Sequence, residues 1–200
     1  HDKRLRASAM LDIKGKKIII DAGPDFRYQM LRSQVKDLRA ILLTHGHKDH
    51  IGGLDDVRAF NWVKQGAVDV YGNEGTREVV YKDFSYAFAA FRYPGVPEIN
   101  YHVIDDRPFY IDDIQVVPIP VLHYKMPVLG FRIGNFAYIT DAKTIPASSM
   151  ERLKGVEYLV INALRKELHM SHFNLEEALT MIARIQPKSA FLTHIGHQMG

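Results

Sequence analysis

The sequence of 200 residues contains no cysteine, a single tryptophan and no apolar run close to the length that spans a bilayer. It also lacks the charged, apolar and small-residue pattern of a secretory signal peptide. These absences argue against a membrane partner and predict a soluble, cytoplasmic protein. Without cysteine, the sequence itself cannot supply thiolate ligands to a metal ion.

Basic and acidic residues are nearly balanced. Lys and Arg number 26 against 23 Asp and Glu, which gives a formal net charge of +3. A protein that binds duplex nucleic acid would show a dense stripe of Lys and Arg. Nucleic acid is therefore a disfavoured partner, although the charge does not exclude it.

The apolar content of 46% over 200 residues is enough for one compact domain with a two-layer core. The sequence has no internal repeat, low-complexity tract or linker that would divide it. We therefore expect a single domain over residues 1–200. No pattern in the sequence indicates the oligomeric state.

The segment 44–50 places three imidazoles and a carboxylate within six positions. It follows the apolar run 40–43, which predicts a short buried strand, and it contains Gly46, which allows a sharp turn. The polar side chains would therefore project from the carboxyl end of a strand. Imidazole nitrogen and carboxylate oxygen together are typical ligands of zinc, manganese or iron. The four residues are His45, His47, Asp49 and His50.

A single motif of this kind has too few ligands for two metal ions, so the metal hypothesis predicts more His or Asp at the ends of later strands. Three later apolar runs meet this expectation. A lone His after a strand is commonly structural, but three recurrences favour a site. The pairs of run and residue are 114–119 with His123, 136–140 with Asp141, and 189–193 with His194.

The order of these residues resembles the metallo-β-lactamase superfamily, whose members carry His-x-His-x-Asp-His followed by a distant His, Asp and His. The resemblance extends from Ile18 to His197. It implies an α/β fold, the αββα sandwich, with two packed mixed sheets flanked by helices. It also implies two divalent ions, zinc or manganese. One ion would be bound by His45, His47, His123 and Asp141, and the other by Asp49, His50, Asp141 and His194.

Within this superfamily the sequence is most similar to the phosphoribosyl cyclic phosphodiesterases of phosphonate breakdown. The similarity lies in residues 4–8, 20–27 and 192–198. In that group a Cys cluster precedes the position of His1, so the resemblance implies that an N-terminal strand and a Cys-containing segment are missing here. His197 would then be a ligand of an additional structural zinc. An ordinary loop or helix-start histidine is the other interpretation of His197, and both stay open.

The run 169–178 predicts a loop that leads into a helix. Asn174 and Glu177 have the spacing of a capping box, which puts His172 just before the helix start. The resemblance implies that His172 donates a proton to the leaving oxygen and that Asp49 also belongs to the catalytic set. A structural loop histidine is the alternative for His172, and His169 is expected beside the site or on the surface. Weaker candidates for phosphate contacts are Arg27, Lys125 and Arg165.

We therefore expect a phosphodiesterase with two metal ions that opens a cyclic phosphate on a phosphorylated ribose or a similar small molecule. A hydroxide that bridges the metals would be the nucleophile and His172 the general acid. One alternative is an RNA 3′-end processing nuclease, although the sequence lacks a long Gly- and Pro-rich arm for RNA. The other is a non-catalytic metal-binding scaffold. The ligand types do not decide between zinc and manganese.

Apolar periodicity also predicts the other elements of secondary structure. An antiparallel pair is expected at 6–13 and 17–20, and a helix near 25–33. A longer helix is expected over 73–91, with an aromatic stripe that packs in the core or in a lid. The stripe consists of Tyr81, Phe84, Phe88 and Phe91, and a shorter helix contains Leu54, Val57, Phe60 and Val63. The remaining strands are expected near 101–104, 109–111, 114–119, 129–133, 136–140, 158–162 and 190–193, with a last helix over 174–185.

Overall fold

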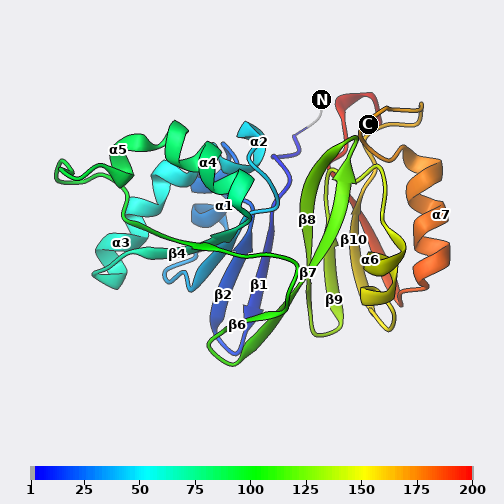
Figure 1. Cartoon of the computed structure of the whole chain (residues 1–200), viewed down its shortest axis with the longest axis horizontal. Coiled ribbons are helices and arrows are strands. Elements are labelled where there is room, and N and C mark those ends of the chain that lie inside the picture. The colour runs from blue at the N-terminus through cyan, green and yellow to red at the C-terminus, as the bar shows by residue number, and fades with distance from the viewer. Residues whose placement is uncertain (1–2, 200) are drawn as a thin grey trace. The chain divides into compact units, whose positions relative to one another are not determined.

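The computed structural model describes residues 3–199, which form two compact units. The N-terminal unit spans Leu5–Asp105, and the C-terminal unit comprises residues 106–199 with residues 3 and 4. Each unit has its own sheet and its own apolar core (Figure 1). The expectation of a single domain over 1–200 stays a prediction, and His1, where a preceding segment was expected, lies outside the described residues.

The sheet of the N-terminal unit has five strands, in the order β1 (Ala9–Ile13), β2 (Lys16–Ile20), β3 (Ala40–Leu42), β4 (Val68–Gly72) and β5 (Ile99–Val103). β1 and β2 form the expected antiparallel pair. Their turn contains Lys14 and Gly15, whose φ angles of 52° and 83° suit a tight hairpin. β2 to β5 run parallel, so their carboxyl ends lie at one edge of the sheet.

Helices flank this sheet and close its core. Ile19, Ile41 and Val70 of the strands are fully buried, as are Phe26 and Leu54 of the helices. Burial of such side chains stabilises the unit by about 1.5–3 kcal/mol each. The helical segments are α1 (Phe26–Arg32), α2 (Lys48–Ile51), the 3-10 turn η1 (Leu54–Val57), α3 (Arg58–Lys64), α4 (Glu74–Asp83) and α5 (Ser85–Phe88).

The prediction of one long helix over 73–91 is wrong. α4 ends at Asp83, and Phe84, with φ −116° and ψ 36°, separates it from α5. The aromatic stripe is only partly in the core: Tyr81 stacks on Phe88 at 3.8 Å between ring centroids, whereas Phe91 is 85% exposed. The break redirects the chain, so helical spacing beyond Phe84 no longer predicts burial.

Two further differences concern neighbouring segments of this unit. The strand β4 was not predicted, although its alternation of buried Val68 and Val70 with half-buried Asp69 has the period of a strand. The helix expected through Leu54 to Val63 is a 3-10 turn followed by α3. Val63 is 65% exposed, because strict three-residue spacing drifts around an α-helix.

The sheet of the C-terminal unit has six strands, in the order β11 (Ser189–Thr193), β10 (Tyr158–Asn162), β9 (Phe136–Ile139), β8 (Met126–Ile133), β7 (Ile114–His123) and β6 (Phe109–Ile111). β9, β10 and β11 are parallel. β8 is antiparallel to both β7 and β9, so β7 runs in the direction of β9. The carboxyl ends of β7, β9, β10 and β11 therefore lie at the same edge of the sheet.

The helical segments of the C-terminal unit are α6 (Ala147–Arg152), which was not predicted, α7 (Leu175–Ile185) and the 3-10 turn η2 (His197–Met199). The capping box is confirmed: the Asn174 side chain accepts from the Glu177 N–H, and the Glu177 side chain accepts from the Asn174 N–H. Ala178 of α7 and Phe173 before it pack in the core with Ile139.

Both sheets are mixed and flanked by helices, which confirms the α/β fold class predicted from the sequence. Within residues 3–199, no helix is both long enough and apolar enough to cross a membrane.

Candidate metal-binding residues

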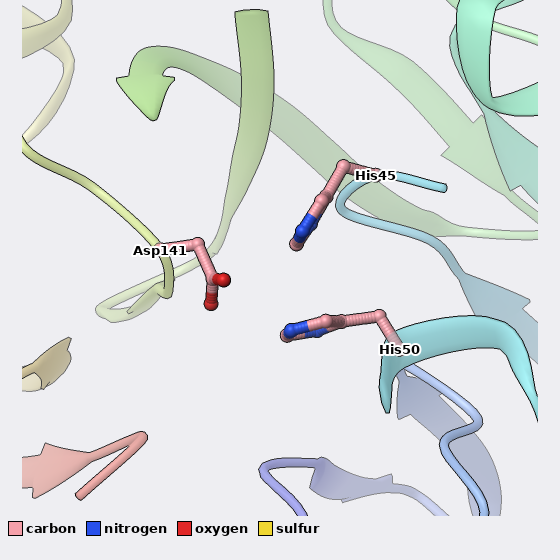
Figure 2. A group of neighbouring side chains, drawn as sticks. All are labelled: His45, His50 and Asp141. Carbon is pink, nitrogen blue, oxygen red and sulfur yellow. The ribbon is translucent and has the colours of Figure 1, made fainter. Parts of the chain in front are cut away.

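The N-terminal ligand set consists of His45, His47, Asp49 and His50. The first follows the carboxyl end of β3, and His47 is the residue just before α2, with an extended backbone at φ −69° and ψ 148°. His45 and His50 are buried, and their rings lie side by side with centroids 4.3 Å apart (Figure 2). The structure thus brings these side chains together within one unit.

Asp21 orients His50. It follows β2 with a positive φ of 64°, and its carboxylate accepts hydrogen bonds from the Thr44 N–H at 2.9 Å and from His50 Nδ1 at 2.7 Å. Because Nδ1 is bound to Asp21, Nε2 is the nitrogen that His50 offers to an ion, and it lies 3.6 Å from Asp49 Oδ2. A carboxylate behind a ligand histidine is a common support of metal sites.

Thr44 performs the same task for His45. The Thr44 hydroxyl donates to Asp21 at 2.9 Å, so it accepts from His45 Nδ1, also at 2.9 Å. His45 therefore offers Nε2, which lies 3.0 Å from His47 Nδ1. Two potential ligand nitrogens are thereby placed next to each other.

Close backbone contacts fix the loop that carries this set. A Cβ on Gly23 would lie 2.1 Å from the Asp49 carbonyl oxygen, and a Cβ on Gly46 would lie 2.9 Å from Val79 Cβ. The Ala22 N–H also donates to the His50 carbonyl at 2.8 Å. Glycine is therefore required at Gly23 for contact with the Asp49 backbone and at Gly46 for contact with the Val79 side chain on α4.

The C-terminal ligand set consists of His123, Asp141 and His194, at the ends of β7, β9 and β11. His123 Nδ1 donates to the Ser171 carbonyl at 2.9 Å and lies 3.1 Å from the Asp141 carbonyl, so Nε2 is the nitrogen available to a metal ion. Asp141, labelled in Figure 2, follows the end of β9, is 2% exposed and has a φ of 56°. Its Oδ1 accepts from Thr140 Oγ1 at 2.7 Å and lies 3.3 Å from His194 Nε2.

Asn162 holds the backbone next to Asp141. It is fully buried at the end of β10, and its side chain both accepts from the Ala142 N–H at 2.8 Å and donates to the Ala142 carbonyl at 3.0 Å. The sequence analysis assigned no role to Asn162 or to Asp21. In each case the available signal was a polar residue directly at the end of a buried strand.

His172 approaches the C-terminal ligand set from the loop before α7. Its Nε2 lies 3.1 Å from Asp141 Oδ2, and its ring is stacked near that of His194 at 5.1 Å. Asp141, His172 and His194 each offer one ligand atom, and these atoms lie within 4.8 Å of one another. Partial burial, and then the nearby His172, lower the pKa of His169.

Both ligand sets fit a divalent cation. Each consists of imidazole nitrogens and a carboxylate, the donors that zinc and related ions use in proteins. The nitrogen that each of His45, His50 and His123 offers is defined by a hydrogen bond at the other ring nitrogen. Orientation of this kind is the support that a metal ligand needs.

The weaker candidates lie in different surroundings. Arg27 is exposed on α1, beside a cavity of about 960 Å³ that Phe60 and Trp62 also line. Lys125 is exposed, with its ammonium 5.5 Å from the Tyr124 ring. Arg165 is half-buried and donates to the Leu168 carbonyl at 2.8 Å. His197 is exposed at the start of η2, and its role as a structural ligand stays a prediction.

Comparison with known proteins identifies relatives. A family model described as Beta-lactamase superfamily domain matches residues 16–195. A protein named octanoyltransferase, from Porphyromonas gingivalis (strain ATCC BAA-308 / W83), is 40% identical over 98% of this chain and 40% of its own length. Ribonuclease Z of Nostoc punctiforme (strain ATCC 29133 / PCC 73102) is 30% identical over 58% of this chain and 37% of its own. The chain thus spans less than half of each of these curated relatives.

Two solved structures are also similar to this chain. The crystal structure of a new diphosphatase from the PhnP family has a TM-score of 0.92 and 37% identity, and covers 100% of this chain and 76% of its own. Human tRNase Z, short form, shares the fold, with a TM-score of 0.76 at 18% identity over 96% of this chain and 86% of its own.

Proposed function

Because the chain belongs to the beta-lactamase superfamily domain family, we propose that it is a metal-dependent hydrolase that cleaves phosphodiesters. The observation that carries the proposal is the similarity to the PhnP-family diphosphatase, at 37% identity over the whole chain. The two oriented ligand sets support the metal dependence, because a hydrogen bond at the second ring nitrogen fixes the nitrogen that a ligand histidine offers to an ion.

We propose that the two ligand sets bind two divalent ions jointly, with Asp141 as the shared ligand. The basis is the order of the residues along the chain, which matches the His-x-His-x-Asp-His motif followed by His, Asp and His. Such ions would supply Lewis-acid activation of a water molecule and neutralise charge on the phosphoryl oxygens. Zinc and manganese both suit the donor types.

His172 is the proposed general acid. The departing alkoxide of a phosphodiester needs a proton, and an imidazole suits this task near neutral pH. In the C-terminal unit, His172 Nε2 lies 3.1 Å from a carboxylate oxygen of the proposed shared ligand. This position supports transfer of a proton from His172 Nε2 to a leaving oxygen bound beside Asp141. Asp49, a member of the N-terminal ligand set, is proposed as a metal ligand in the catalytic set.

The proposed substrate is a small cyclic phosphate on a phosphorylated ribose. The similarity of 20–27 and 192–198 to phosphoribosyl cyclic phosphodiesterases supports this choice, as does the PhnP-family relative. Arg165 is a proposed phosphate contact, because it lies on the segment that joins β10 to the His172 loop. Arg27 and Lys125 are weaker proposals of the same kind.

RNA 3′-end processing is the second candidate, supported by the relatives named ribonuclease Z. The sequence lacks a long Gly- and Pro-rich arm for RNA, whereas the similarity to the PhnP-family diphosphatase covers the whole chain. A 3′-extended precursor tRNA therefore serves as the competing substrate in the test below.

Phosphorus NMR of phosphoribosyl cyclic phosphate, with protein loaded separately with zinc and with manganese, tests the proposal. We expect the parent to release a phosphomonoester and His172→Ala to do so roughly 10²–10⁴-fold more slowly with its metal retained. His102→Asn, a substitution on β5, is the matched histidine control and should keep the parent rate. Cleavage of the precursor tRNA alone would replace the small-molecule assignment, and no cleavage of either would refute the hydrolase.

A further inference from the structure

His169 lies behind the proposed general acid. It is half-buried in the loop before α7, and its Nδ1 lies 3.2 Å from His172 Nδ1, with the ring centroids 5.0 Å apart. The opposite nitrogen of His172, Nε2, is the one that lies 3.1 Å from Asp141 Oδ2. His172 is thus held between another imidazole on one side and the ligand carboxylate on the other.

Hydrogen-bond accounting defines which atom donates between the two rings. The Ser171 backbone N–H donates to His169 Nδ1 at 3.3 Å, so this nitrogen is an acceptor and carries no hydrogen. In a hydrogen bond between the two Nδ1 atoms, which lie 3.2 Å apart, His172 Nδ1 is then the donor and carries the hydrogen. The Ser171 hydroxyl, 3.1 Å from His172 Nδ1, can accept from the same N–H. His169 keeps its own proton on Nε2.

We propose that His169 is a positioning residue that fixes the ring orientation of His172 by accepting a hydrogen bond from its Nδ1. The proposal rests on the proposed function, because it assigns the Nε2 edge of His172 to proton transfer. With Nδ1 held, the ring cannot flip, and Nε2 always faces the reacting group. Such support resembles the role of the group that orients the base in other catalytic histidine arrangements.

The chemical step balances with this assignment. The oxygen of a hydroxide ion forms a new bond to phosphorus as the P–O bond to the leaving oxygen breaks and its electron pair stays with the leaving oxygen. The N–H bond at His172 Nε2 breaks, and its proton forms the new O–H bond on the leaving oxygen. His172 is left neutral with its proton on Nδ1, still bonded to His169 Nδ1. Water later returns a proton to Nε2. His169 neither gains nor loses a proton.

Two substitutions of similar size separate positioning from packing. His169→Asn keeps an acceptor oxygen near the Nδ1 position, whereas His169→Leu removes it. Each is assayed on a phosphodiester with an alkoxide leaving group and on one with a nitrophenolate leaving group, which needs little acid assistance. Met170→Ala, which changes an exposed neighbour in the same loop, is the control and should match the parent on both esters.

We expect His169→Leu to cleave the alkoxide ester about tenfold or more slowly than the parent. This is part of the roughly 10²–10⁴-fold rate increase that a general acid supplies. On the nitrophenolate ester the rate of the variant should stay near that of the parent. His169→Asn should stay near the parent on both, and the metal content of all variants should be unchanged. Equal losses on the two esters, no loss in the Leu variant, or failure of Asn to restore the rate would each overturn the proposal.

Nitrogen NMR of the His172 side chain gives a readout that does not depend on turnover. We expect a hydrogen on Nδ1 of His172 in the parent and in His169→Asn, and a changed tautomer in His169→Leu. A bare Nδ1 in the parent would overturn the inference even for an active enzyme. If the parent cleaves neither ester, the proposed function fails, and the spectrum still decides whether His169 orients His172.

Discussion

The two ligand sets are built differently. The N-terminal set places His45, His47, Asp49 and His50 on one loop and one short helix, held by Asp21 and by two glycines at close contacts. The C-terminal set takes its three residues from the ends of three separate strands, and a buried asparagine on a fourth holds the backbone beside Asp141. One set is local in the sequence, and the other exists only because strand ends share an edge.

This difference determines what each set can tolerate. Removal of one support in the N-terminal set leaves the loop held by its other contacts, such as the Ala22 to His50 backbone bond. The C-terminal set has no continuous segment to hold it, so each member depends on sheet register and on a few buried hydrogen bonds. We therefore expect larger effects from changes in the C-terminal set.

The largest effect is expected for Asp141→Ala. Loss of the proposed shared carboxylate should reduce both metal content and phosphodiester cleavage, by more than the roughly 10–100-fold cost of a change behind a ligand. Metal analysis of the desalted protein, together with the cleavage rate, checks this. Retention of both ions at full occupancy would show that Asp141 is not the bridging ligand.

Asn162→Ala should have a large effect on folding. It removes the side-chain oxygen that accepts from the buried Ala142 N–H, and an unsatisfied buried donor costs roughly 1–3 kcal/mol. The Ala142 carbonyl also loses its bond from Asn162 but still accepts from the Phe173 N–H at 2.8 Å. Urea unfolding of the metal-free protein measures the free energy of unfolding of each variant and of the parent. Asn135→Ala, whose side chain is in an exposed contact with Glu157, is the control and should change stability little. Equal stability of the two variants would contradict the role given to Asn162.

Asp21→Asn should weaken metal binding by about 10–100-fold, because it alters the group that orients His50 without removing a ligand. Titration of metal-free protein with zinc against a competing chelator measures the affinity. The exposed Asp12→Asn, which loses only a contact to Lys17, is the matched control. An affinity equal to that of the parent would mean that the loop alone orients His50.

The smallest effect is expected away from both sets, at Asp69 on β4. Burial acts to raise the pKa of Asp69, but hydrogen bonds from His102, Arg39 and Asn100 outweigh it and hold the pKa at about 2, below its usual 3.8. A depressed pKa means that this stabilisation is present above about pH 4 and is lost as the pH falls toward 2. In chelator-treated protein, Asp69→Asn should lower the melting temperature at pH 7. The difference in melting temperature between the parent and the variant should become smaller by pH 2. A difference in melting temperature that stays constant over this pH range would contradict the depressed pKa of Asp69.

The sequence predicts much of the N-terminal set, because four ligand-type residues in six positions are visible without any structure. It also places His123, Asp141 and His194 at strand ends, and the structure confirms those strands. That the two sets bind ions jointly stays a prediction. The fold class follows from the resemblance to the metallo-β-lactamase superfamily, and the capping box follows from the local spacing of Asn174 and Glu177.

Other features depend on contacts that no local pattern carries. Asp21 acquires its role only when β2 and β3 pair, and Asn162 only when β9 and β10 pair. The break at Phe84 interrupts an otherwise helical pattern, and Ala87 beyond the break packs in the core. His169 has a role only through the folded loop that brings it to His172.

The measurement that tests the central claim most directly is the number of zinc ions retained per chain, by elemental analysis after loading and desalting. The parent, His50→Ala and His194→Ala are compared, so that one ligand is removed from each set. We predict two ions in the parent and a loss in both variants. Full retention in either variant, or a parent that binds no zinc, would contradict joint metal binding by the two ligand sets.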